Sequence, residues 1–171
     1  MGRLPSMDEP PSDTRPSMVQ RVVDAAAARG VTVEVTRFPH GTRTTEEAAA
    51  AIGCDVAAVC KSIVLMADGE PVVVLASGAN RVDTGKVAAE VDADQARLAS
   101  PEEVQEATGW PIGGTAPYGN PEAMWLLLDD DLLAQEEVWA AGGLPDAVFP
   151  IAPDQLLETS GAEVADVAER G

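Results

Sequence analysis

The sequence predicts one α+β domain in which helices surround a mixed β-sheet, and three observations lead to this fold class. The chain has 171 residues, 46% of them hydrophobic, which suits the core of a single domain. Its predicted elements mix a strand hairpin with helices that cross between strands, unlike the strict alternation of a doubly wound parallel sheet. No segment repeats with a period of about 20 to 50 residues, which excludes solenoids and propellers.

The beginning of the domain is predicted by a helix cap and an alternating strand. Residues 1–17 are rich in Pro, Ser and Asp and lack the apolar core of a secretory signal, so we expect a disordered tail and a domain over 18–171. Ser17 is a suitable N-cap for a helix that continues through Ala28. Valine then alternates with polar residues over 31–36, which predicts a half-buried strand.

The middle of the chain predicts a helix followed by a hairpin. Thr44 or Thr45 is expected to cap a helix that ends at Ile52, and a glutamate three residues after Thr44 completes a capping-box pattern. Two apolar runs, over 61–67 and 70–76, are separated by an Asp-Gly pair. This pair is typical of a tight turn between antiparallel strands.

The second half predicts short helices and strands. Helices are expected over 83–90 and 101–108, the latter because glutamates occupy its first turn and a glycine follows its end. Strands are expected over 124–128 and 147–151, and a proline begins a last helix over 153–159.

A shaped loop is predicted over 110–121, because three glycines and three prolines exclude a helix or a central strand there. Within it, the stretch Gly113–Pro117 can turn several backbone N–H groups toward one point. Such a nest is able to bind a developing oxyanion or a ligand carbonyl, but a Gly-Pro loop can equally serve as a turn alone.

Lys61 is the leading candidate for chemistry. The chain has only two lysines, Lys61 and Lys86, and Lys61 lies at the entrance of an apolar strand. A charged side chain placed there needs an anionic partner, which is either a bound ligand or a salt-bridge partner at the strand end.

Other reactive residues have simpler structural interpretations. His40, the only histidine, has no recognisable serine or cysteine partner for general-base catalysis. Cys60 could be a nucleophile, but a buried small hydrophobe is the simpler interpretation. The triplet Asp129–Asp131 lacks the spacing of a calcium loop and is expected to be a solvated strand end. No metal site is predicted, and no phosphate-loop or dinucleotide motif indicates a cofactor.

The charge pattern limits the partners. A net charge of −18 at pH 7 argues against nucleic acid, because phosphate binding depends on Lys and Arg. However, every basic residue except Arg170 lies at or before Arg97, which indicates a polarised surface, unless the acidity serves only solubility. The apolar runs are shorter than the ~20 residues of a membrane span, and two cysteines make no disulfide framework, so we expect a cytoplasmic protein.

Four ordered segments together resemble the YbaK/EbsC family, which includes trans-editing aminoacyl-tRNA deacylases and the editing domain inserted in bacterial prolyl-tRNA synthetase. These segments are Thr45–Ala49, Val59–Val64, Ser77–Asp83 and Gly113–Pro117. The resemblance covers about residues 18–168. It implies a central curved sheet and hydrolysis of the ester that links a wrong amino acid to the tRNA 3′ terminus.

The resemblance also implies site residues. Lys61 matches the family's characteristic lysine, which is thought to position the terminal nucleotide or its phosphate. Gly113–Pro117 matches the family's G-x-x-x-P loop near the acyl group, so Gly113 and Gly114 join Lys61 as expected catalytic residues. The expected substrate-binding residues are Thr45, Ser62, Gly78, Thr115, Pro117 and Gly142. A positioned water, backbone donors and a ribose hydroxyl would carry the proton chemistry without a catalytic triad.

The substrate amino acid stays open. The cysteinyl-tRNA-specific member of the family has Ser-Gly-Gly followed by Asp, whereas this chain has Ala141-Gly142-Gly143 before Leu144-Pro145-Asp146. We therefore predict an aminoacyl-tRNA deacylase that acts on aminoacyl-tRNA, with an aminoacyl-tRNA synthetase as a candidate partner. The alternatives are a non-catalytic module that binds tRNA or a synthetase, and a hydrolase of small acyl esters.

Overall fold

The structure is a computed structural model that describes residues 17–37, 44–110, 115–121 and 124–169. Within them lie five α-helices, α1 (Met18–Ala28), α2 (Thr45–Ile52), α3 (Thr84–Glu90), α4 (Pro101–Thr108) and α5 (Pro153–Ser160), and two 3₁₀ turns, η1 (Val56–Ala58) and η2 (Asp130–Ala134). The strands are β1 (Thr36–Arg37), β2 (Val59–Ala67), β3 (Glu70–Ser77), β4 (Ala96–Leu98), β5 (Trp125–Asp129), β6 (Val138–Ala141), β7 (Ala147–Ile151) and β8 (Glu163–Ala165).

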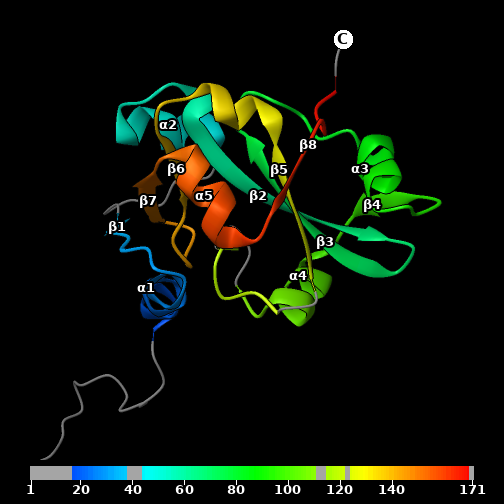
Figure 1. The fold of residues 1–171 in the computed structure, drawn as a ribbon, viewed down its shortest axis with the longest axis horizontal. Coiled ribbons are helices and arrows are strands. Elements are labelled where there is room, and N and C mark those ends of the chain that lie inside the picture. Colours follow the sequence, from blue (N-terminus) through cyan, green and yellow to red (C-terminus); the bar gives the residue numbers. More distant parts are fainter. Residues whose placement is uncertain (1–16, 38–43, 111–114, 122–123, 170–171) are drawn as a thin grey trace, which may run out of the picture.

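The described strands form one mixed sheet, which confirms the predicted fold class. Their order is β1-β7-β6-β2-β3-β5-β8, and β4 pairs with β2 outside this path. The pairs β2–β3, β2–β4, β6–β7 and β1–β7 are antiparallel, whereas β2–β6, β3–β5 and β5–β8 are parallel. In Figure 1 the long β2–β3 hairpin curves across the molecule, with α2 near its open end and α3 and β4 toward its turn.

The hairpin turn has the conformation that its sequence predicts. Asp68 and Gly69 both have positive φ, 49° and 84°, as a turn matched to the twist of two antiparallel strands requires. The ladder then runs from the pair Ala67↔Glu70 to the pair Cys60↔Ser77. The turn therefore fixes the register at which Lys61 enters the sheet.

Helix ends are also set locally. Helix α4 has the predicted bounds, because the side chain of Ser100 accepts a hydrogen bond from Glu103 N and the side chain of Glu103 accepts one from Ser100 N. Gly109 ends the helix with φ 77°. Helix α1 begins at its predicted cap, where Ser17 accepts from Gln20 N. Among the described helices, none is long and apolar enough to cross a membrane.

The strand predicted over 31–36 is wrong for most of its length, because only Thr36 continues into β1. Val31 and Val33 are buried, with 3% and 5% of their surfaces exposed, so the alternation correctly indicates which side chains face the core. Alternation does not, however, supply a neighbouring strand with which to form a ladder. Three strands were also not predicted, namely β4, β6 and β8, which have only three or four residues each.

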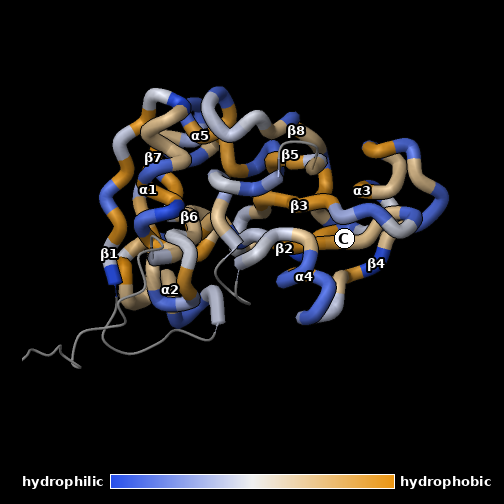
Figure 2. The backbone as a smooth tube through the Cα atoms, turned by 90° about the horizontal axis from the view of Figure 1, so that it is seen from below, coloured by the Kyte–Doolittle hydropathy of each residue, from blue (hydrophilic) through white to orange (hydrophobic). Residues whose placement is uncertain are grey.

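The sheet separates two hydrophobic cores. Cys60 and Val64 of β2 face the larger core, to which α1 and α5 contribute, whereas Leu65 and Ala67 face a smaller core covered by α3. Hydrophobic residues accordingly follow β3 and β5 through the middle of the molecule (Figure 2). Since side chains alternate along a strand, Lys61 lies on the opposite face from Cys60 and Ser62.

Candidate functional site

Strand β2 has an opening in one of its two edges. On this edge it pairs with β6 only through Val59 and Cys60, and with β4 only from Leu65 onward. Among the described residues no strand pairs with the stretch between the two ladders, although Val64 O accepts a hydrogen bond from Ala99 N. Residues 61–63 therefore lie at a split in the sheet.

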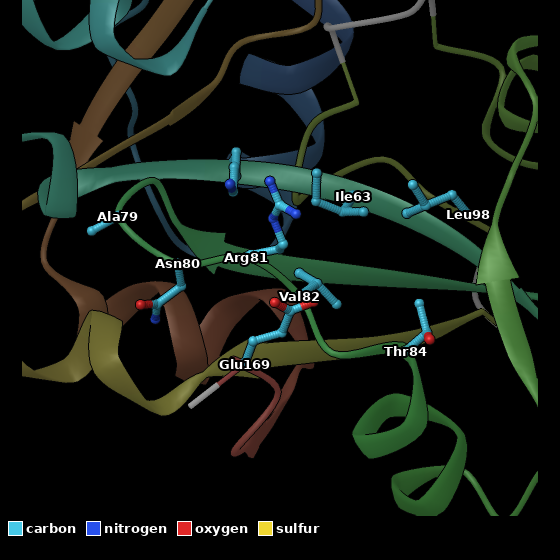
Figure 3. A pocket seen from close by; sticks show the side chains of 9 residues that line it. Ile63, Ala79, Asn80, Arg81, Val82, Thr84, Leu98 and Glu169 are labelled. Carbon is cyan, nitrogen blue, oxygen red and sulfur yellow. The ribbon is translucent and has the colours of Figure 1, made fainter. Parts of the chain in front are cut away.

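A cavity of about 540 Å³, here called the cationic cavity, opens beside Lys61 and Ile63. Its other lining residues are Ala79, Asn80, Arg81, Val82, Thr84, Leu98 and Glu169. Arg81 extends from the loop after β3 toward β2, and Glu169 lies on the side of the cavity away from β2 (Figure 3). Two cations and one carboxylate thus share a cavity whose remaining lining is uncharged.

Lys61 and Arg81 stand out among the basic residues that the structure describes. Neither side chain has a hydrogen bond or ion pair within the described residues, although acids outnumber bases 29 to 11 in the chain. The other described basic side chains donate to carboxylates or backbone carbonyls, namely Arg21, Arg29, Arg37, Lys86 and Arg97. Two unpaired cations at one cavity indicate a binding site for an anion.

The electrostatics of Lys61 fit this interpretation. Burial lowers the pKa of Lys61 below 10.5, the carboxylates of Glu46 and Asp129 oppose this shift, and the positive charge of Arg81 adds to it. The two carboxylates therefore do not fully offset the cost of burying this ammonium group. A bound anion would stabilise its charged form further.

A second cavity of about 190 Å³, here called the neutral cavity, lies on the other side of the opening. Apart from Lys61, its lining residues are uncharged: Thr44, Thr45, Ala48, Val59, Cys60, Ser62, Thr115, Trp139, Ala141, Pro145, Ala147 and Val148. A third cavity of about 220 Å³ shares Ser62 and Thr115 with it. The open stretch of β2 therefore lies between a cavity lined by two cations and a carboxylate and a cavity whose lining is uncharged apart from Lys61.

The predicted site residues divide into three groups. Lys61, Thr45, Ser62 and Thr115 line the same neutral cavity. Gly113 and Gly114, like His40, lie outside the described residues. The remaining three, Gly78, Pro117 and Gly142, do not line the cationic or the neutral cavity.

Those three residues have positions that packing explains. A Cβ on Gly78 would overlap the methyl group of Thr45 and lie 2.5 Å from Val56 O. A Cβ on Gly142 would lie 2.9 Å from the side chain of Val35. Pro117 lines a separate cavity against α1. The lack of room for a Cβ is therefore a sufficient reason for both glycines.

Thr44 is a helix cap and Cys60 is a buried thiol, as the simpler interpretation of each predicts. The side chain of Thr44 accepts from Glu47 N at 3.0 Å and caps α2, and Thr45 is the first helical residue. Burial, and then the charge of Asp129, raises the pKa of Cys60 to about 12, so its thiol stays protonated near neutral pH and is a poor nucleophile.

Asp129 corrects the expectation of a solvated strand end. Its side chain is fully buried and accepts hydrogen bonds from Ser77 N at 3.1 Å, Asn80 Nδ2 at 2.9 Å and Asp131 N at 3.0 Å. These bonds hold the loop that carries Arg81.

Two residues that line the cationic cavity, Arg81 and Glu169, were not predicted from the sequence. For Arg81 the available signal was an Asn-Arg pair in a polar turn.

Ser62 provides a further observation at the opening. Its hydroxyl oxygen is buried and has no hydrogen-bond partner among the described residues, although such groups are nearly always paired. The oxygen belongs to a residue that lines both the neutral and the third cavity. An unpaired hydroxyl there is available to a ligand.

We predict that Ser62→Ala leaves the free energy of unfolding unchanged or raises it by about 1 kcal/mol, because an unsatisfied buried group is removed. Ligand binding or turnover should nevertheless decrease about tenfold. Denaturant unfolding with an activity assay checks both effects. Ser160→Ala is the control: Ser160 Oγ accepts from Ala162 N, so its loss should destabilise the chain. Comparable destabilisation by Ser62→Ala would contradict the prediction.

Comparison with known proteins gives a consistent result. Residues 40–159 match the family model of the aminoacyl-tRNA editing domain. The chain is 32% identical to the uncharacterized protein YwhH of Bacillus subtilis (strain 168) over 132 residues, 77% of this chain and 83% of that protein. It is 41% identical to the proline–tRNA ligase of Solidesulfovibrio magneticus over 103 residues, 60% of this chain but only 17% of the ligase.

Two solved structures share the fold and a substantial part of the sequence. One is a candidate trans-editing enzyme for prolyl tRNA synthetase, with a TM-score of 0.84, 42% identity and coverage of 92% of this chain and 100% of that one. The other is a hypothetical protein with a TM-score of 0.80, 33% identity and coverage of 87% of this chain and 99% of that one.

Proposed function

Because the chain belongs to the aminoacyl-tRNA editing domain family, we propose that it is a trans-editing hydrolase that cleaves the ester bond of misacylated aminoacyl-tRNA. The observation that carries this proposal is the pair of cavities at the split edge of β2. The cationic cavity, where Lys61 and Arg81 have no ion-pair partner among the described residues, suits the phosphate of an RNA 3′ end. The adjoining neutral cavity suits a small aminoacyl group.

In the proposed reaction Lys61 is a binding cation and not a general base. It holds the terminal nucleotide so that the ester reaches the neutral cavity, where Thr45, Ser62 and Thr115 contact the substrate. A water molecule attacks the ester carbonyl carbon, and the bond from that carbon to the ribose oxygen breaks. The water proton passes to the ribose oxygen, giving free amino acid and a tRNA with its hydroxyl restored.

The negative charge that develops on the carbonyl oxygen needs donors. We assign this role to backbone N–H groups of the Gly113–Pro117 loop, with Gly113 and Gly114 as catalytic residues. Thr115, the middle residue of that loop, lines the neutral cavity and supports the assignment. Fixed backbone donors of this kind typically contribute about a hundredfold or more to the rate.

A synthetase is a fitting partner for this activity. The chain carries a net charge of −18, so its own affinity for tRNA should be low. Because Lys61 and Arg81 are the cations at the cationic cavity, this affinity should also decrease with salt. A synthetase that has just released a charged tRNA would supply the missing affinity. The reaction would then take place in the cytoplasm, where aminoacyl-tRNA is used.

The lowered pKa of Lys61 predicts a pH dependence of RNA binding. In the free protein burial lowers the pKa of the Lys61 ammonium group below 10.5, so the group loses its proton as the pH rises through that lowered pKa. Affinity for an oligonucleotide with the tRNA 3′ sequence should therefore decrease as the pH rises toward that value. Fluorescence anisotropy between pH 7 and pH 10.5 measures this decrease. Lys61→Arg keeps its charge over the whole range and should show no such decrease.

The experiment that tests the function is a panel of mischarged tRNAs. The purified chain is incubated with each of them at a concentration above that of the tRNA, and the remaining ester is measured against a buffer control. Hydrolysis of at least one member above the buffer rate supports the proposal. Binding of tRNA without hydrolysis of any member would favour a binding module, and activity on small esters without tRNA affinity would favour a general esterase.

A further inference from the structure

One side of the neutral cavity depends on a chain of contacts that starts at Ala116. Its carbonyl oxygen accepts a hydrogen bond from Asn120 Nδ2 at 2.7 Å, and Asn120 Oδ1 accepts one from Trp110 Nε1 at 3.0 Å. An indole N–H can only donate, so it fixes the orientation of the amide of Asn120 and directs the NH₂ group at Ala116. Ala116 directly follows Thr115, which lines the cavity.

Arg21 of α1 completes this chain. Its Nη2 donates to Gly119 O at 2.7 Å and to Thr108 O at 3.3 Å. Its guanidinium carbon also lies 4.1 Å from the ring centroid of the fully buried Trp110, an arrangement that favours a cation over an aromatic face. A single side chain therefore ties together the backbone on both sides of the segment 111–114.

The two carbonyl-bearing turns are shaped around this guanidinium group. Gly109 and Gly119 have φ values of 77° and 89°. A Cβ on Gly119 would lie 3.1 Å from Trp110 Cζ2 and 3.5 Å from Arg21 Nε, and one on Gly109 would lie 3.2 Å from Arg21 Nη1. Both turns therefore need glycine for their conformation. An added Cβ would be tight against the guanidinium group at Gly109 and against the Trp110 ring at Gly119.

Arg21 lies outside the part of the chain that matches the editing-domain model. The part of the sequence that matches the editing-domain model begins at residue 40, whereas Arg21 belongs to a helix before it. Helix α1 also packs through apolar residues, such as the fully buried Val22 and Ala26. Arg21 adds a directed polar contact between this helix and the segment that borders the site.

We propose that Arg21 is a positioning residue for hydrolysis, acting through Trp110 and Asn120 to hold the segment that contains Thr115 and Ala116. The inference rests on the proposed function, because it assigns that segment to the acyl side of the substrate. Within the described part of the chain, neither Lys61 nor Arg81 has a hydrogen bond to Arg21, Trp110, Asn120 or Ala116. Loss of Arg21 should consequently slow the chemical step while binding of the RNA end is kept.

The first test compares Arg21→Ala with Arg29→Ala. Arg29, the residue after α1, also donates to a backbone carbonyl, that of Thr159, but among the described residues it has no hydrogen bond to Trp110, Asn120 or Ala116. For a tRNA ester that the wild type hydrolyses, Arg21→Ala should lower kcat at least tenfold and change KM less than threefold. Arg29→Ala should leave both within twofold. Equal kcat values for the two variants would overturn the proposal.

A second variant keeps the test decisive if Arg21→Ala does not fold. Asn120→Asp retains an oxygen to accept from Trp110 Nε1, but it replaces the donor to Ala116 O by a carboxylate oxygen. The proposal requires a similar decrease in kcat at nearly constant KM, with a folded circular dichroism spectrum. Wild-type kcat in this variant would overturn the positioning role.

The failure of the proposed function looks different from the failure of this inference. If the wild type hydrolyses no ester, the function itself is wrong, and the positioning role is then overturned as well. If the wild type is active and both variants keep its kcat, only the role of Arg21 is wrong.

Discussion

Replacing Lys61 by methionine is expected to lower kcat/KM for deacylation at least about a hundredfold, the scale of losing a charged group that holds the reacting substrate. Methionine has nearly the length of lysine and no charge, so the packing along β2 should be maintained. Because the lysine is half-buried with a lowered pKa and without an ion-pair partner among the described residues, its removal should not destabilise the chain. Steady-state kinetics and thermal unfolding measure the two effects.

The other lysine of the chain is the matched control. Lys86 donates to both carboxylate oxygens of Asp166, at 3.2 and 3.1 Å, and to Ala168 O at 2.8 Å. Lys86→Met should therefore cost some stability, of the order of 1 kcal/mol, and leave kcat/KM within about threefold. If the two variants had equal activity, the assignment of Lys61 to the substrate would be wrong.

Gly78→Ala is expected to lower the free energy of unfolding by about 3 kcal/mol, a large value for the addition of one methyl group. The new Cβ would overlap the side chain of Thr45, lie 2.5 Å from Val56 O and lie 3.2 Å from Val59 Cβ. Backbone has to move to relieve these contacts, because Gly78 N is also bonded to Val59 O at 2.7 Å. Activity should decrease as well, since Thr45 borders the neutral cavity.

Gly69→Ala separates steric overlap from backbone strain. Gly69 has φ 84° but no atom within 4 Å of an added Cβ, so the substitution should cost only about 1 kcal/mol. Denaturant unfolding of both variants checks the difference. A cost for Gly78→Ala no larger than that for Gly69→Ala would show that the crowding around Gly78 relaxes without penalty.

Elements with a local cause were predictable from the sequence. The Asp68-Gly69 turn sets the register of the longest hairpin, and the capping box at Ser100 sets the start of α4. Each depends on residues within one turn of the chain, where sequence and conformation are directly coupled.

Elements that depend on residues distant in the sequence were not predictable from it. The segment over 31–36 alternates like a strand, but only its last residue pairs, because the available edge is that of β7 at Ala147 and Val148. Strands β4, β6 and β8 are too short for a periodic pattern. Asp129 lies in an acidic triplet typical of solvated strand ends, and its burial follows from donors some 50 positions earlier, at Ser77 and Asn80.

The candidate site shows the same division. The family resemblance singled out Lys61 and three residues that line the neutral cavity with it, Thr45, Ser62 and Thr115, because they belong to its motifs. It also singled out Gly78, Pro117 and Gly142, which do not line that cavity. The sequence does not show that Arg81 lies at the site. Among the described residues Arg37, Lys86 and Arg97 form ion pairs and Arg81 does not, and only the structure shows this difference. Arg21 was likewise no candidate, because its targets are backbone carbonyls 87 and 98 positions away.

The measurement that tests the central claim most directly is single-turnover deacylation of a panel of mischarged tRNAs by the wild type and Lys61→Met in parallel. The account predicts that the wild type hydrolyses at least one aminoacyl ester well above the buffer rate and that Lys61→Met does not. Absence of hydrolysis of every tRNA in the panel by a folded wild-type protein in excess over the substrate would contradict it.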